Sequence, residues 1–285
     1  MRLCRFAEDR IGLVRNGQVF DVTPALAALN YHYPLPRFDP LIAHLPTLRA
    51  DIERTAGEAA GRPLAQIGLL SPIANPGKII AAPVNYRKHL AEARADAAIH
   101  HQKQVEEIER VGLFLKATSS VVGPSQGVAI RHPDRRTDHE IELAAVIGRQ
   151  ADRVSVNEAL GYVAGYCIGL DMAVRGTEDR SFRKSVDTYT VIGPWLTTAD
   201  EIADPQNLML WLALNGKERQ RSSTAAMTVA IPRLIELAST VYTLYPGDIL
   251  LTGTPEGVGA IAAGDIITAG CEGLGEFSIA VTAQS

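Results

Sequence analysis

Three acidic residues stand beside or within apolar sequence, where a carboxylate is costly unless it is paired. Glu140 and Glu142 directly precede an apolar stretch, and Asp171 is the only charged residue between positions 164 and 174. On a strand, the two-residue spacing of the glutamates places both carboxylates on one face. Hard divalent cations such as Mg²⁺, Mn²⁺ or Ca²⁺ prefer oxygen ligands, so these acids are candidate metal ligands. The other interpretations are an exposed strand edge for the glutamates and a cap or an ion pair with Arg175 for Asp171.

A histidine and a glutamate form a second candidate pair. His89 and Glu92 are three residues apart, which makes them neighbours on one face of a helix. A carboxylate bonded to an imidazole fixes its tautomer and raises its basicity, as the activation of a water molecule requires. From the spacing alone, a surface pair without a catalytic role is the other interpretation.

Two further segments are suited to a negatively charged ligand. Lys184 lies in a polar stretch and is either a solvated loop residue or a cation that stabilises an enolate oxygen. The Gly- and Thr-rich segment 251–259 follows an expected strand and offers backbone N–H groups and hydroxyls to an anion. It lacks the Gly-Lys-Ser/Thr ending of a P-loop, which disfavours nucleotide binding.

The scaffold that must position these residues is predicted to be α+β and rich in strands. After Gly112, short apolar or alternating runs are separated by Gly and Pro turns, and only segments 156–160 and 231–240 have a clear helical pattern. Such a succession favours a sandwich or a roll over a doubly wound sheet.

The first part of the chain combines both kinds of element. Short alternating runs around Asn16-Gly17 predict a hairpin, and segment 24–61 has helical spacing, although Pro46 is expected to break or restart a helix. A proline-rich connector follows. We therefore expect a small N-terminal domain in residues 1–70 and a main domain in residues 71–285.

A polar segment from about 86 to 110 follows the first strand of the main domain. Its composition favours helix, but it has few apolar residues to bury, which is typical of a mobile lid or of a solvated helix. His100 and His101 belong to this segment, and they are expected either to be solvated or to reach the site in a closed state.

Composition excludes several classes of protein. The chain has 28 Lys and Arg against 32 Asp and Glu, a net charge of −4, so no basic surface for nucleic acid is expected. No run of about 18 apolar residues predicts a membrane span. The N-terminus does not resemble a secretory signal, and the three cysteines form no CxxC pair. A cytoplasmic protein with reduced thiols is therefore expected.

From about residue 78 to the C-terminus, the order of motifs resembles the fumarylacetoacetate hydrolase superfamily. The matching motifs are Asn85-Tyr86-Arg87-Lys88-His89, Asp138-His139-Glu140-Ile141-Glu142-Leu143, Asp171 with Arg175, Tyr245-Pro246-Gly247-Asp248 and Thr252-Gly253-Thr254-Pro255. The resemblance implies a catalytic domain with a mixed β-roll, a small N-terminal α/β domain and a homodimer.

The resemblance also implies roles for individual residues. Members bind Mg²⁺ or Mn²⁺ through two glutamates and an aspartate, which by motif position are Glu140, Glu142 and Asp171. The implied catalytic residues are His89, Glu92 and Lys184, and the implied substrate-binding residues are Arg175, Gly253, Thr254 and Glu178. Glu178 stands where many members carry Gln, and Arg183 where Gly is common, so the identity of the substrate stays open.

The reaction implied is the hydrolysis of a carbon–carbon bond in a β-diketo acid, which gives a pyruvate-type product and a carboxylic acid. The candidate substrates are acylpyruvates such as fumarylpyruvate, and diketo sugar acids. Two alternatives use the same scaffold: decarboxylation of an oxaloacetate-like acid, and isomerisation or hydration of an unsaturated 2-oxo acid. An alternative of another class is a metal-binding dimer without catalytic activity.

Overall fold

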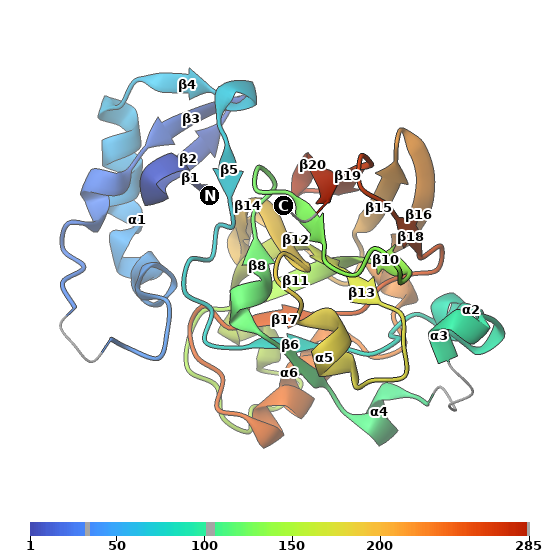
Figure 1. Cartoon of the computed structure of the whole chain (residues 1–285). Coiled ribbons are helices and arrows are strands. Elements are labelled where there is room, and N and C mark those ends of the chain that lie inside the picture. Colours follow the sequence, from blue (N-terminus) through green and yellow to red (C-terminus); the bar gives the residue numbers. More distant parts are fainter. Residues whose placement is uncertain (32–34, 101–105, 284–285) are drawn as a thin grey trace.

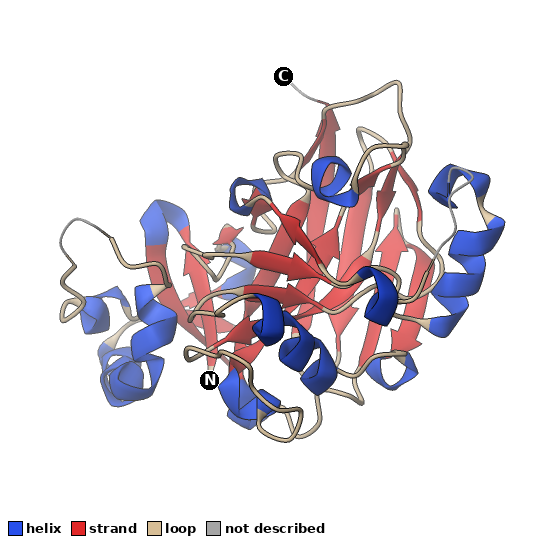
Figure 2. Cartoon of the chain, turned by 90° about the horizontal axis from the view of Figure 1, so that it is seen from below, coloured by secondary structure: helices blue, strands red, loops and turns tan. Residues whose placement is uncertain are grey.

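The computed structural model describes residues 1–31, 35–100 and 106–283 as a strand-rich α+β fold (Figures 1 and 2). Its largest sheet combines strands from residues 2–116, strands from residues 121–198 and one strand from residues 249–251. In spatial order these are β4 (Gly61–Pro63), β3 (Gln18–Asp21), β2 (Arg10–Arg15), β1 (Arg2–Phe6), β14 (Thr190–Thr198), β12 (Val163–Asp171), β11 (Ile141–Ile147), β17 (Ile249–Leu251), β6 (Ile79–Ala81) and β7 (Phe114–Lys116). Two short strands join this sheet: β5 (Leu69–Leu70) pairs with β1, and β8 (Val121–Val122) pairs with β14.

Two smaller sheets complete the fold. The first contains β13 (Ala173–Val174), β10 (Thr137–His139) and β18 (Gly259–Ile261). The second contains β16 (Lys217–Ser223), β15 (Met209–Leu214), β19 (Ile266–Cys271), β20 (Gly275–Ala283) and β9 (Val128–Ile130). The helices of the described residues are α1 (Pro40–Glu58), α2 (Arg87–Ala95), α3 (Ala97–His100), α4 (Ile108–Val111), α5 (Arg180–Lys184) and α6 (Ile231–Val241).

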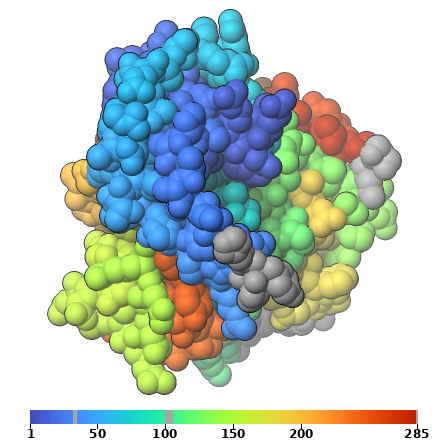
Figure 3. All heavy atoms as spheres, turned by 90° about the vertical axis from the view of Figure 1, so that its left-hand side faces the viewer, coloured from blue at the N-terminus to red at the C-terminus, as the bar shows by residue number. Residues whose placement is uncertain are grey.

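The N-terminal module is built on the predicted hairpin, in which Val14 pairs with Val19 across the Asn16-Gly17 turn. Helix α1 packs beside this hairpin, and the N-terminal segment, drawn in blue, covers the upper part of the face shown in Figure 3. The prediction that Pro46 breaks the helix was wrong, because α1 is continuous from Pro40 to Glu58. Pro46 costs the helix one backbone hydrogen bond. The buried side of α1 nevertheless packs into the core through Ile42, Leu45, Leu48 and Ile52.

Asp39 fixes the start of α1 and ties it to two segments that are distant in the sequence. Its carboxylate accepts hydrogen bonds from the backbone N–H groups of Ile42 at 3.2 Å and Asn75 at 3.0 Å, and its own N–H donates to the Pro246 carbonyl at 2.8 Å. We expect Asp39→Ala to lower the free energy of unfolding by about 1–3 kcal/mol, since two donors lose their acceptor. Chemical denaturation measures this, with the exposed Asp51→Ala of the same helix as the control. A loss as small as that of the control would show that the cap is dispensable.

Strands β11 and β12 form the buried centre of the fold. Residues Ile141, Leu143 and Ala145 pack into one hydrophobic cluster, whereas Ala144 and Val146 pack into a second cluster shared with the N-terminal module. Both faces of β11 are therefore covered, which explains its nearly continuous apolar sequence. Glu142 lies on the face of Ala144 and Val146, as the period of a strand requires.

The helical predictions of the second half had different outcomes. The helix expected at 231–240 is α6, which begins at Ile231 with Pro232 in its first turn. The prediction of a helix at 156–160 was wrong, because this segment forms turns and a short 3₁₀ helix at Ala159–Tyr162. So short a segment before β12 does not repay the cost of nucleating an α-helix.

The segment predicted as a lid is helical at its start. Helices α2 and α3 lie on the opposite side of the molecule from α1 (Figure 1). His100 ends α3, and His101 lies outside the described residues. Among the helices that the structure describes, none has the length and apolar character needed to cross a membrane.

Candidate active site

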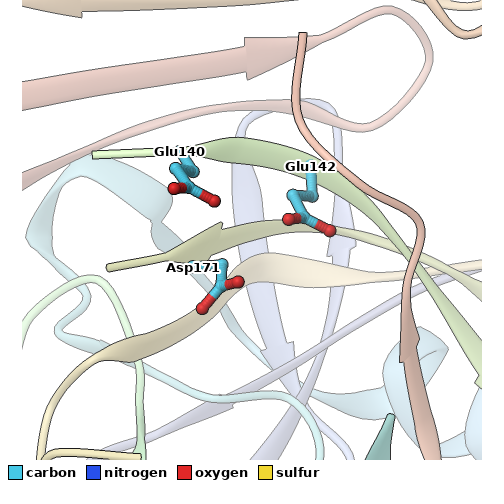
Figure 4. Close-up of side chains that lie close together, drawn as sticks. All are labelled: Glu140, Glu142 and Asp171. Carbon is cyan, nitrogen blue, oxygen red and sulfur yellow. The ribbon is translucent and has the colours of Figure 1, made fainter. Parts of the chain in front are cut away.

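The three predicted acids converge at one end of β11 and β12 (Figure 4). Glu140 directly precedes β11, Glu142 lies within it, and Asp171 ends β12. The antiparallel pairing brings the two strand ends together, and the Asp171 N–H donates to the Glu140 carbonyl at 2.9 Å. One carboxylate oxygen from each residue lies within 4.8 Å of the others, and all three side chains are buried. The exposed strand edge considered for the glutamates is therefore excluded.

Three cationic side chains surround the acids. Lys184 Nζ donates to Glu140 Oε2 at 2.7 Å and to Asp171 Oδ2 at 2.6 Å. Lys116 Nζ pairs with the other oxygen of Asp171, and Arg175 donates to Glu140 Oε1 at 3.0 Å. The interpretation of Lys184 as a solvated loop residue is thereby excluded. Asp171 does not pair with Arg175, whose second partner is Asp138 at 2.7 Å.

The pKa values of the two glutamates are shifted in opposite directions. Burial alone would raise the pKa of Glu140, but Lys184 and Arg175 outweigh it and lower the pKa to about 2. Burial and the neighbouring Asp171 raise the pKa of Glu142 well above its usual value. Glu142 is a buried carboxylate that no lysine or arginine of the described residues pairs with directly. Together with Glu140 and Asp171 it offers only oxygen ligands, so a bound cation would supply the positive charge that Glu142 lacks. The residues present therefore fit a hard divalent cation such as Mg²⁺ or Mn²⁺.

The predicted His–Glu pair lies on α2 and contacts the loop after β17, which also contacts Glu142. His89 Nδ1 contacts Glu92 Oε2 at 2.8 Å, and the other Glu92 oxygen accepts a hydrogen bond from the Gly257 N–H at 3.0 Å. The pair is not a surface feature, because His89 is only 3% exposed. His89 lies near enough to Glu140 to affect its pKa. With Nδ1 held by Glu92, the Nε2 atom is the nitrogen that remains for a water molecule.

The loop after β17 reaches the same place. The Gly253 N–H donates to Glu142 Oε2 at 2.6 Å, and Thr254 is buried. Gly253 has φ +96°, and a Cβ there would lie 2.5 Å from the Asn85 Cβ, so this position requires glycine. The Asn85 amide donates to the Thr252 carbonyl at 2.8 Å and thereby fixes the loop beside the start of α2.

Glu178 has no contact with the acids in the described part of the chain. It is at the surface, where it pairs with Arg135 at 2.8 Å. Arg183 donates to the carbonyls of Glu178 and Val174, both at 2.9 Å, and so orders this turn. A substrate-binding role for Glu178 stays a prediction.

Sequence reasoning missed three residues of the site. Lys116 is the only charged residue between positions 111 and 130. The same kind of signal, an isolated charge, identified Asp171. Asp138 was included in a motif but was given no role, although it holds Arg175. Gln220 carried no signal, because an amide in a polar strand is ordinary, yet its side chain is buried and contacts Thr254.

A buried set of oxygen ligands, with a histidine beside it on a strand-rich scaffold, defines a class of metal-dependent enzymes. Within this class, the model of the fumarylacetoacetate (FAA) hydrolase C-terminal domain matches residues 78–282, and the chain belongs to this family.

Relatives support the assignment over the whole chain. Maleylpyruvate hydrolase from Aquipseudomonas alcaligenes is 52% identical over 284 residues, which cover 99% of each chain. The structure of maleylpyruvate hydrolase from Sphingobium sp. SYK-6 is 38% identical, has a TM-score of 0.86 and covers both chains in full. A second structure of that protein is in complex with manganese(II) and pyruvate, with a TM-score of 0.85.

A more distant relative has the same fold. Fumarylacetoacetate hydrolase from Exiguobacterium antarcticum is 28% identical, with a TM-score of 0.75 and full coverage of both chains. Together these findings confirm the predicted family, the strand-rich α+β fold and a hydrolase that uses a divalent metal.

Proposed function

We propose that this protein hydrolyses an acylpyruvate, with maleylpyruvate as the first candidate, to pyruvate and the corresponding carboxylic acid. The observation that carries this proposal is the buried group of Glu140, Glu142 and Asp171, which shares one loop with the His89–Glu92 pair. The 52% identity with a maleylpyruvate hydrolase supports the choice of substrate.

The side chains of this site divide the chemical work. A divalent cation held by Glu140, Glu142 and Asp171 would supply Lewis-acid stabilisation at the 2-oxo acid end of the substrate. His89 Nε2 would take a proton from the attacking water, while Glu92 at Nδ1 stabilises the imidazolium that forms. The hydroxide would add to the distal carbonyl carbon, the bond between that carbon and the pyruvate unit would break, and His89 would return its proton to the carbon of the leaving enolate.

Lys184 is suited to the negative charge that develops on the leaving pyruvate enolate. Burial would lower the pKa of Lys184, but Asp171 and Glu140 outweigh burial and raise it, so this amine stays charged. The Gly253–Thr254 loop would bind the carboxylate of the substrate, because its groups lie beside Glu142. Arg175 bonds to both Glu140 and Asp138, which favours a role in holding Glu140 over direct binding of the substrate.

We further propose that the protein works as a homodimer in the cytoplasm. Mg²⁺ is proposed as an alternative cation, and the boundary between the two domains is proposed to lie near residue 70. The family resemblance supports the dimer. The three free, buried cysteines are in keeping with a reducing compartment.

The test is a panel of substrates offered to the metal-stripped protein with and without Mn²⁺ or Mg²⁺. We expect maleylpyruvate to lose its ultraviolet absorbance only when the cation is present, with pyruvate and maleate formed in equal amounts. Fumarylpyruvate tests the geometry at the distal double bond, and oxaloacetate tests decarboxylation. Release of carbon dioxide from oxaloacetate without cleavage of any acylpyruvate would replace the proposal with a decarboxylase, and isomerisation without cleavage would indicate an isomerase.

A further inference from the structure

Gln220 is a buried amide on a strand that is otherwise mostly polar and open to solvent. It is 1% exposed, whereas its neighbours Arg219 and Arg221 are exposed. The pairing of β16 with β15 shifts register at this point, since Leu212 faces Gln220 and Ala213 faces Glu218. The extra residue, Arg219, forms a β-bulge. Bulges change the direction of side chains, and this one accompanies a glutamine that points to the interior.

The four hydrogen bonds of the Gln220 amide determine which way round it lies. Its Nε2 donates to Thr254 Oγ1 and to the Pro255 carbonyl, both at 2.9 Å. Its Oε1 accepts from the Ile141 N–H at 3.1 Å and contacts His139 Nδ1 at 3.1 Å. A carbonyl can only accept and a backbone N–H can only donate, so the amide cannot be turned over.

This orientation determines the polarity of the Thr254 hydroxyl. Because the oxygen of Thr254 accepts from Gln220, its own hydrogen remains for another acceptor. The described residues offer it none, although Thr254 is only 2% exposed. Thr254 follows Gly253, whose N–H contacts the metal-ligand candidate Glu142 at 2.6 Å. The hydroxyl is therefore held beside the acids as a donor.

Gln220 also joins the two parts of the site. Ile141, which donates to its Oε1, stands between Glu140 and Glu142, while Thr254 and Pro255 belong to the loop after β17. The loop packs closely on the bulge, because a Cβ on Gly257 would lie 2.1 Å from the Arg219 carbonyl oxygen. One amide thus sets the distance between the strand that carries the glutamates and the loop.

We propose that Gln220 is a positioning residue that holds the Thr254 hydroxyl as a hydrogen-bond donor to the carboxylate of a 2-oxo acid bound beside Glu142. The proposal rests on the proposed function for the class of ligand, but binding alone tests it. Gln220 itself does not touch the ligand. It acts by fixing where the Thr254 oxygen lies and where its hydrogen points.

The test is a double-mutant cycle on pyruvate affinity, measured by calorimetry with the Mn²⁺-loaded protein. Thr254→Val removes the donor, and we expect pyruvate to bind about tenfold more weakly or worse, since the hydrogen bond is to a charged group. Gln220→Leu keeps the volume but leaves the hydroxyl unfixed, and we expect a loss of about threefold to tenfold. In the Thr254→Val background, Gln220→Leu should change the affinity less than twofold.

Gln220→Glu is a second variant that keeps an acceptor for the Ile141 N–H. It puts a carboxylate oxygen against Thr254, which would draw the hydroxyl hydrogen away from the ligand, so we expect a loss at least as large as in Gln220→Leu. Gln206→Leu is the matched control, because the Gln206 amide bonds to the Thr224 carbonyl and the Ile231 N–H away from the acids. Pyruvate affinity should be unchanged in this control.

Several results would overturn the inference. They are equal losses from Gln220→Leu in the wild-type and Thr254→Val backgrounds, full pyruvate affinity in both Gln220 variants, or no pyruvate binding by the Mn²⁺-loaded wild type. If pyruvate binds and the cycle shows coupling, but maleylpyruvate is not cleaved, the positioning role holds and only the proposed reaction fails. Mn²⁺ affinity and the thermal midpoint of each variant show whether a loss arises from a damaged metal site or fold.

Discussion

His89→Gln is expected to lower kcat by about two to four orders of magnitude, while Mn²⁺ affinity stays close to that of the wild type. The imidazole contacts Glu92 through Nδ1 and is buried beside Glu140, so it is placed to move a proton. Glutamine keeps polar atoms in the same space but cannot act as a base near neutral pH. Steady-state kinetics on maleylpyruvate and calorimetric titration with Mn²⁺ measure the two quantities separately.

Two companion variants make this result specific. Glu92→Gln should cause a smaller fall in kcat, because a neutral amide still accepts from the Nδ1–H group but does not stabilise the imidazolium. His44→Gln is the matched control, since His44 lies on α1 and contacts Tyr31 rather than the acids. If His89→Gln lost Mn²⁺ together with activity, His89 would be a metal ligand and the role of base would have to go to another residue.

The local part of the site was readable from the sequence. Glu140 and Glu142 flank Ile141 at the start of β11, and their two-residue spacing alone places them on one face. His89 and Glu92 meet because a helix brings residues three apart together. Asp171 could be selected because an isolated charge in apolar sequence needs a partner.

The convergence of these pieces depends on pairings between distant segments, which local spacing does not contain. Asp171 reaches the glutamates only through the register that sets Ile141 opposite Leu170. Lys116 reaches Asp171 across 55 positions of the chain, through the order of strands in the largest sheet. The inward direction of Gln220 depends on a bulge, and the sequence of β16 gives no sign of it.

The short elements could not be predicted from the sequence either. Helix α5 spans only Arg180–Lys184 and has no apolar period, yet it carries Lys184 into the site. It is held by tertiary contacts and by its Asp179 cap, whose carboxylate accepts from the Ser181 N–H at 2.8 Å. The continuity of α1 through Pro46 has a similar cause, because buried contacts on both sides of the proline outweigh one missing hydrogen bond.

Glu142→Gln is expected to abolish activity and to weaken Mn²⁺ binding by at least two orders of magnitude, yet to make the metal-free protein more resistant to heat. The loss of metal follows from replacing a charged oxygen ligand by an amide at the carboxylate whose charge the surrounding cations compensate least. The gain in stability follows from the raised pKa of Glu142, which burial and Asp171 cause. A carboxyl with a raised folded-state pKa contributes stability below its unfolded pKa and loses that contribution as the pH rises through the folded value.

At neutral pH the buried Glu142 therefore destabilises the metal-free wild type, and glutamine removes this destabilisation. Each kcal/mol gained in the free energy of unfolding should raise Tm by about 2–4 °C. The glutamine oxygen can still accept from the Gly253 N–H, so the loop should stay in place. Scanning calorimetry of both proteins in EDTA, at pH 5 and at pH 8, measures the effect, and the gap in Tm should be larger at pH 8. Asp171→Asn is the contrasting variant: it should lose metal but gain no stability, because it removes the negative charge that pairs with both Lys116 and Lys184 and leaves only one of the two acceptor oxygens. A metal-free Glu142→Gln protein that melts below the wild type at both pH values would show that the uncompensated charge lies elsewhere.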